Sequence, residues 1–154
     1  LSQHVELNVV DGLILPNLRM TEGADACPFL NEQGRCSIHA YRPGICRLFP
    51  LGRFYENDSF RYFLQVHECP KPSKAKIKVY KWLDTDDIRT YEQFISDWHY
   101  FLKALQERIA GMEDQAQIRS ICMYVLQQFY LAPCEDFYEA FHGRLDEAKR
   151  YFHM

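Results

Sequence analysis

Several features that define familiar protein classes are missing from this sequence. It has no run of 18 or more apolar residues, which excludes a membrane-spanning helix. Its net charge of −3 argues against electrostatic attraction to nucleic acid or to an anionic membrane. It also lacks the closely spaced cysteine pairs with which zinc ribbons and fingers hold their metal. We therefore expect neither a nucleic-acid partner nor a membrane partner.

The composition is that of a chain able to fold around its own core. The 154 residues are 47% hydrophobic, 15% aromatic and 25% charged, so disulfides are not needed for stability. We predict a single domain in which residues 1–83 form a metal-binding region and residues 84–154 a helical region packed on it. The sequence begins at Leu1 rather than at Met, which is compatible with a fragment of a longer chain.

The first half of the chain predicts hairpins separated by irregular loops. Asp11-Gly12 lies between two β-prone runs in residues 5–15, and Asn57-Asp58 has the same place in residues 52–66. Residues 27–50 have no apolar period and are interrupted by proline and glycine, so a metal would serve to organise them. The lysine-rich residues 71–81 are typical of a solvated connector, with an anion-binding patch as the alternative.

The second half predicts three amphipathic helices. Apolar residues recur at helical spacing from the acidic stretch 84–87 up to Gly111, then over about 114–131 and about 135–152. Their short connections favour an antiparallel bundle. We therefore predict an α+β protein, with short β-hairpins and loops around a cysteine metal site and a C-terminal bundle of three α-helices.

Four of the six cysteines gather in residues 27–69, and we predict that they ligate a metal: Cys27, Cys36, Cys46 and Cys69. Thiolates favour Zn²⁺ and iron–sulfur clusters over hard cations, and four sulfurs complete either shell. The gaps of eight, nine and 22 residues favour an iron–sulfur cluster wrapped by loops, with zinc as the second choice. Buried thiols or disulfides are the alternative.

Other residues near these cysteines are candidates for a supporting role. His39 and His67 are possible extra ligands or hydrogen-bond partners of the ligands, although a structural role is also open. We expect Arg42 and Arg47 to brace the loop that carries Cys46 by bonding its carbonyls. Of the two remaining cysteines, Cys122 lies on an apolar helical face and is predicted to be a core residue, and Cys134 a bystander.

Residues 27–69 also carry a specific pattern: C-x-F-L, then C-x-I-x-x-x-R-P-x-x-C-R-x-F-P, then a further cysteine in HEC. This pattern resembles the YkgJ-type cysteine-cluster proteins, a family to which zinc or iron chelation is attributed. The resemblance implies that the family's downstream cysteines correspond to the four proposed ligands. The family typically opens with C-x-x-C-x-x-C-C, whereas no cysteine precedes Cys27 here. That element either lies outside this sequence or is lacking in this variant.

Three hypotheses about function follow. The chain is an iron–sulfur or zinc protein of redox or maturation chemistry that works with a protein partner, a structural zinc module that binds another protein, or a metal- or thiol-dependent enzyme. The sequence names no substrate, so enzymatic activity is left open, and we expect a cytoplasmic location.

Overall fold

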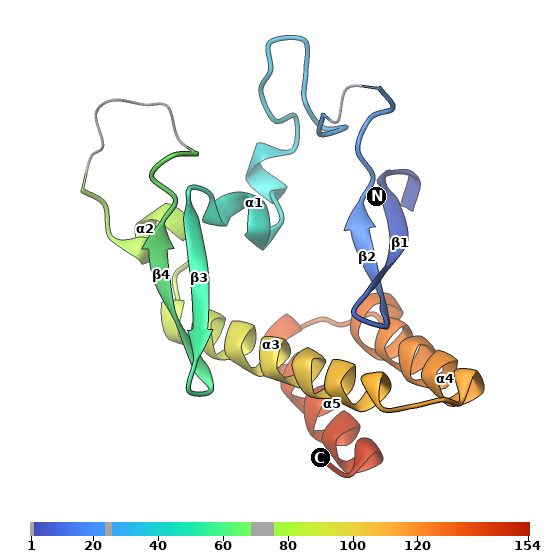
Figure 1. The fold of residues 1–154 in the computed structure, drawn as a ribbon. Helices are drawn as coiled ribbons and strands as arrows, with labels where there is room; N and C mark the ends of the chain where they lie inside the picture. The colour runs from blue at the N-terminus through green and yellow to red at the C-terminus, as the bar shows by residue number, and fades with distance from the viewer. Residues whose placement is uncertain (1, 24–25, 69–75) are drawn as a thin grey trace. The chain divides into compact units, whose positions relative to one another are not determined.

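The computed structural model describes residues 2–23, 26–68 and 76–154 (Figure 1). The elements follow one another in this order: a 3₁₀ helix at Ser2–His4, β1 (Val5–Val10), β2 (Leu13–Leu18), a 3₁₀ helix at His39–Tyr41, α1 (Gly44–Leu48), β3 (Leu51–Glu56), β4 (Ser59–Leu64), α2 (Val79–Leu83), α3 (Ile88–Ala110), α4 (Gln115–Val125), a π-helix at Leu126–Leu131 and α5 (Phe137–Phe152). The two hairpins and the helical second half confirm the predicted α+β class. Within the described residues, no helix has the length and apolarity needed to cross a membrane.

The chain forms two compact units. Unit 1 comprises residues 1–28 and 101–154, and unit 2 comprises residues 29–100, so α3 contributes to both. Cys27 belongs to unit 1, whereas Cys36 and Cys46 belong to unit 2. The predicted assignment of residues 1–83 to metal binding within a single domain remains a prediction.

The hairpin of unit 1 turns where the sequence predicted. β1 and β2 pair antiparallel with Val10 opposite Leu13, and the two turn residues, Asp11 and Gly12, have φ angles of 47° and 86°. Positive φ at both positions matches the right-handed twist of the strands. A Cβ at Gly12 would lie 2.6 Å from Cγ2 of Ile109 on α3, so this turn also needs glycine for close packing.

The helices of unit 1 carry most of the buried apolar residues. Asp114 accepts a hydrogen bond from the N–H of Ala116 at 2.8 Å and so caps α4, and Asp136 caps α5 through the N–H of Glu139. The predicted helix 114–131 is present, but its last six residues form a π-helix. Residues from α3, α4, the π-helix, α5 and β2 are buried in this core: Leu13, Phe101, Leu105, Ile109, Ile121, Cys122, Val125, Leu126, Phe141, Leu145, Ala148 and Phe152.

The hairpin of unit 2 is also confirmed. Asn57 and Asp58, with φ angles of 51° and 55°, connect β3 to β4, and Glu56 lies opposite Ser59. Short polar side chains tolerate this left-handed backbone better than other non-glycine residues do. The hairpin packs on the first half of α3, where the ring of Tyr55 stacks on His99 with centroids 3.5 Å apart.

Two short helices of unit 2 were not predicted. α1 and α2 pack against each other, with Leu48 and Leu83 buried, and the indole N–H of Trp82 donates to the carbonyl of Phe49 at 3.2 Å. α2 begins at Val79, so the last residues of the predicted connector are helical. Each helix has five residues, too few to show an apolar period and too short to be stable without packing.

Candidate metal centre

A tight loop positions Cys36. Leu30 and Cys36 face each other as an antiparallel bridge pair, and the side-chain oxygen of Asn31 accepts hydrogen bonds from the N–H groups of Gln33 and Arg35 at 3.1 and 2.8 Å. Asn favours such a turn because its side chain satisfies backbone donors two to four residues on. Cys36 is half-buried at the end of this loop. The chain therefore orders this thiol with backbone hydrogen bonds rather than with a hydrophobic core.

Cys46 lies in the middle of α1, directly after the Arg-Pro-Gly turn. Pro43 precedes the helix, and its carbonyl accepts hydrogen bonds from the N–H groups of Cys46 and Arg47 at 2.9 and 3.3 Å. The fixed φ of proline suits the start of a helix. Cys46 is exposed, so a metal or a partner protein can reach its sulfur.

Arg47 holds this segment together through its guanidinium group. Its Nε donates to the carbonyl of Arg42 at 3.1 Å, and its Nη2 donates to the carbonyl of Ala40 at 3.2 Å. Its Nη1 donates to the carbonyl of Asp84 at 3.1 Å and lies 3.4 Å from the Asp84 carboxylate. The side chain is 25% exposed, so these hydrogen bonds are partly shielded from solvent. Arg47 thus bonds carbonyls of the turn before Cys46, as predicted.

Arg42 contributes differently from Arg47. Its backbone carbonyl accepts from Arg47, but its side-chain Nε is buried and has no hydrogen-bond partner within the described part of the chain. The bracing expected of the Arg42 guanidinium is therefore not seen among these residues. Instead, the backbone carbonyl of Arg42 accepts a hydrogen bond from Arg47. We call the hydrogen bonds from the Arg47 guanidinium to the carbonyls of Arg42, Ala40 and Asp84 the Arg47 clamp.

Asp84 was not anticipated as a member of this site. It ends α2 in the left-handed conformation, with φ of 53°, and this places both its carbonyl and its carboxylate within reach of Arg47. Asp tolerates this conformation better than most residues, so the acidic stretch 84–87 held a signal for a helix end. The contact spans 37 positions of sequence, however, and nothing in the local pattern joins it to Cys46.

Among the described residues, Arg47 makes no hydrogen bond to Cys27, His39 or His67. Cys27 is half-buried in unit 1, directly after Ala26, whose carbonyl accepts from the N–H of Thr21 at 2.9 Å. His39 is exposed in the 3₁₀ helix of residues 39–41, and His67 is exposed in the turn after β4. Cys69 lies outside the described residues.

Within residues 2–23, 26–68 and 76–154, no group of three or more Cys, His, Asp or Glu side chains is arranged to hold a metal ion. The predicted four-sulfur shell includes Cys69 and joins residues of two units, so it remains a prediction. The chemistry of the donors suits the predicted metals. The half-buried thiol of Cys36 and the exposed thiol of Cys46 in unit 2 are soft ligands, as zinc and iron–sulfur clusters require.

The two late cysteines have other surroundings. Cys122 is only 1% exposed, and its Sγ lies 3.5 Å from the carbonyl of Gly12, to which the thiol donates. This confirms the prediction that it is a buried core residue. Cys134 is exposed in the connection between the π-helix and α5.

Cys36 lies on a hydrogen-bonded loop and Cys46 on a short helix, and both thiols belong to a small α+β chain. Residues 8–86, just over half of the chain, match the CxxCxxCC family, described as "Putative zinc- or iron-chelating domain". The chain belongs to this family. No curated protein and no solved structure matches it.

The matched residues lack the motif after which the family is named. They contain four cysteines, and none is followed by another cysteine three positions later. Membership therefore rests on the rest of the matched segment, which includes β2, the hairpin of β3 and β4, and the Arg-Pro-x-x-Cys-Arg turn that Arg47 clamps.

Proposed function

We propose that this protein holds an iron–sulfur cluster through four thiolates, those of Cys27, Cys36, Cys46 and Cys69. The family supports zinc or iron chelation, and the donor set of four sulfurs suits either metal. The observation that carries the proposal is the Arg47 clamp. A charged side chain that bonds three backbone carbonyls fixes the turn before Cys46, although little of that turn is buried.

Two features favour iron–sulfur over zinc. The cysteines are widely and unevenly spaced, whereas structural zinc sites usually take ligands in closely spaced pairs. Thiolates on separate loops can wrap a cluster larger than a single ion. When bound, such a cluster would supply one-electron chemistry, so we propose a role in redox reactions or in metal-centre maturation, in the cytoplasm.

Arginine and histidine would tune the site. Arg47 brings a permanent positive charge close to Cys46 in sequence, and such cations favour the thiolate form that binds metal. His39 and His67 are exposed and close in sequence to Cys36 and Cys69, so either would serve as an additional ligand or as a hydrogen-bond donor to one.

A protein partner is part of this proposal. Tyr41 and Ile45, which flank the clamped turn, are 85% and 69% exposed. Large apolar side chains beside an accessible thiol suit a surface that another protein covers during metal or electron transfer.

The alternatives use the same thiols. In a structural zinc module, the metal would only stabilise the loops while the helices bind another protein. In an enzyme, the metal or a thiolate would act on a substrate that neither the sequence nor the family names.

Anaerobic purification followed by analysis of iron, zinc and acid-labile sulfide separates these possibilities. The proposal predicts a brown protein with iron and sulfide in equal amounts. A colourless protein with stoichiometric zinc and no sulfide would support the zinc module instead. A protein that takes up neither metal after reconstitution would overturn both.

A further inference from the structure

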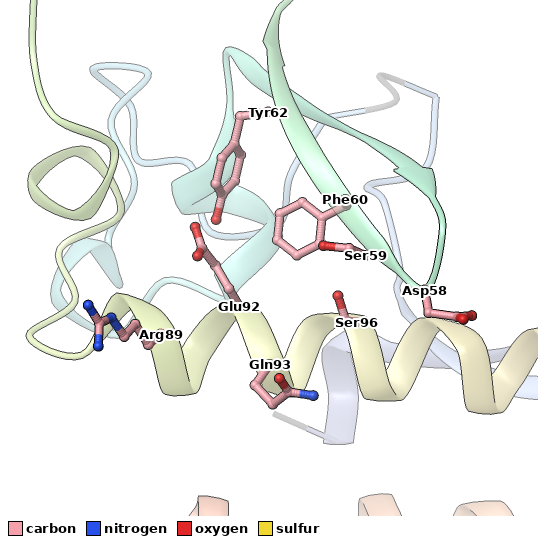
Figure 2. A pocket seen from close by; sticks show the side chains of 8 residues that line it. All are labelled: Asp58, Ser59, Phe60, Tyr62, Arg89, Glu92, Gln93 and Ser96. Carbon is pink, nitrogen blue, oxygen red and sulfur yellow. The ribbon is translucent and has the colours of Figure 1, made fainter.

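Unit 2 contains a cavity that none of the described cysteines lines. Its volume is about 300 Å³, at the lower end of the range of small-molecule sites. It lies between β4 with its preceding turn and the first half of α3 (Figure 2). The residues lining it are Asp58, Ser59, Phe60, Tyr62, Arg89, Glu92, Gln93 and Ser96.

The lining of this cavity combines carboxylates, hydroxyls and aromatic rings with the side chains of Arg89 and Gln93. Figure 2 shows the hydroxyl of Tyr62 and the carboxylate of Glu92 directed toward each other, while the guanidinium of Arg89 points away from both. The Tyr62 hydroxyl oxygen is buried, and the carboxylate of Glu92 is the group that it faces. Ser96 is 8% exposed, so a second hydroxyl is buried in the wall. The cavity is therefore lined by two aromatic rings, from Phe60 and Tyr62, and by the half-buried carboxylate of Glu92.

Glu92 has no cationic neighbour within ion-pair distance in the part of the chain that the structure describes. The nearby Arg53 is engaged elsewhere: its Nη2 donates to the Tyr91 hydroxyl at 2.5 Å, and its guanidinium lies over the Phe60 ring. Burial, with a smaller contribution from Glu92, raises the pKa of Tyr62, so this phenol stays neutral. A half-buried carboxylate without a counter-ion is costly, and a cation entering the cavity would offset that cost.

We propose that this cavity binds a small organic cation, an alkylammonium or guanidinium group. Glu92 supplies the counter-charge at its centre, Asp58 supplies a second carboxylate at its rim, and the Ser96 hydroxyl accepts a hydrogen bond. The aromatic rings of Phe60 and Tyr62 form the wall for the alkyl part. This site shares no residue with the proposed metal ligands, so its failure would leave the metal proposal untouched.

Titration with n-butylammonium chloride, followed by NMR of the backbone amides, tests the site. We expect saturable shifts confined to residues 58–62 and 89–96, with a Kd on the order of 1 mM for so small a ligand. n-Butanol and butyrate, which keep the alkyl chain but change the head group, should not saturate. Shifts of equal size with n-butanol, or no saturable shift with the amine, would overturn the proposal.

Variants locate the charge that binds the amine. Glu92→Gln should weaken binding about tenfold, and Asp58→Asn, which keeps a residue suited to the positive φ of the turn, about threefold. Glu107→Gln removes an equal charge from the far end of the same helix and should change nothing. If both cavity variants bind like the unaltered protein, the assignment is wrong. Melting curves of Glu92→Gln and Asp58→Asn, each matching that of the unaltered protein, check that neither effect is a loss of folding.

A lysine derivative blocked at both its amino and carboxyl ends distinguishes the two sources of such a cation. If the blocked lysine binds as tightly as butylammonium, the cavity accepts the side chain of a protein lysine. If only butylammonium binds, the cavity accepts the cation of a small metabolite. Either result supports a cation site.

Discussion

Cys46 and Cys122 show how differently one chain can use the same residue. Cys122 is packed among apolar side chains in the helical core of unit 1, with 1% of its surface exposed. Cys46 is exposed on a five-residue helix of unit 2, where hydrogen bonds of Arg47 hold the backbone in place. Burial makes Cys122 a core residue with an unreactive thiol. Exposure and a neighbouring cation suit the thiol of Cys46 to metal binding.

The difference extends to what stabilises each region. Unit 1 depends on apolar burial, which tolerates changes of surface charge but not cavities. The cysteine segment of unit 2 depends on caps, turns and one guanidinium clamp, each of which is a directional contact. Core and clamp variants should therefore affect different properties.

The largest effect is expected from a cavity in the core of unit 1. Leu105 is fully buried, so Leu105→Ala should lower the free energy of unfolding by about 2–5 kcal/mol. Leu131, which is 72% exposed, provides the matched control, and Leu131→Ala should change stability by no more than about 0.5 kcal/mol. Denaturant unfolding measures both. Equal costs for the two variants would contradict the described core.

A smaller effect is expected from breaking the clamp. Arg47→Ala removes hydrogen bonds to three carbonyls and should lower stability by roughly 1–3 kcal/mol and reduce metal retention. Arg47→Lys keeps the charge but not the planar fork, so it should restore only part of the loss.

Arg61 offers a control for Arg47. Its Nε lies 3.4 Å from the Glu56 carboxylate, but its side chain is 68% exposed. Arg61→Ala should therefore cost at most about 1 kcal/mol and leave the metal content unchanged. If Arg47→Ala and Arg61→Ala behave alike, the clamp has no special role.

The smallest effect concerns the start of α3. Asp87 accepts hydrogen bonds from the hydroxyl and the N–H of Thr90 at 2.7 and 3.1 Å, and these bonds hold the pKa of its carboxyl below the usual value. Because the folded-state pKa is the lower one, this contribution is complete above the unfolded-state pKa, about 3.9, and is lost as the pH falls through the folded-state value.

Asp87→Asn should thus lower the melting temperature slightly at neutral pH, and the difference should vanish on acidification. Asp86→Asn, a change of the same charge at the preceding exposed residue, is the control. Melting curves that keep a constant difference between Asp87→Asn and the unaltered protein down to acidic pH would contradict this account of the cap.

Local signals explain why much of the fold could be predicted. The turn residues at 11–12 and 57–58, the acidic stretch 84–87 before α3, and the apolar periodicity of the helices each act within a few positions of sequence. α1 and α2 were missed because each is only five residues long and is stabilised by burying Leu48 and Leu83. The π-helix was missed because an apolar period does not distinguish it from an α-helix.

The candidate site divides in the same way. The hydrogen bonds from Arg47 to backbone carbonyls could be predicted because this residue lies beside a loop without regular backbone pairing. Its partner Asp84 could not be predicted, because it is 37 positions away in sequence and only the fold brings the two together. The side chain of Arg42, expected to act likewise, makes no such bond among the described residues. The cavity beside Glu92 could not be predicted, because it depends on which face of β4 packs against α3.

The central claim is that thiols of residues 27–69, and not the buried thiol of Cys122 on α4, hold the metal. Its most direct test is the iron and zinc content per chain of Cys46→Ala and Cys122→Ala, both purified anaerobically beside the unaltered protein. The account predicts that Cys46→Ala loses most of its metal while Cys122→Ala keeps all of it. Full metal content in Cys46→Ala, or loss of metal in a folded Cys122→Ala, would contradict it.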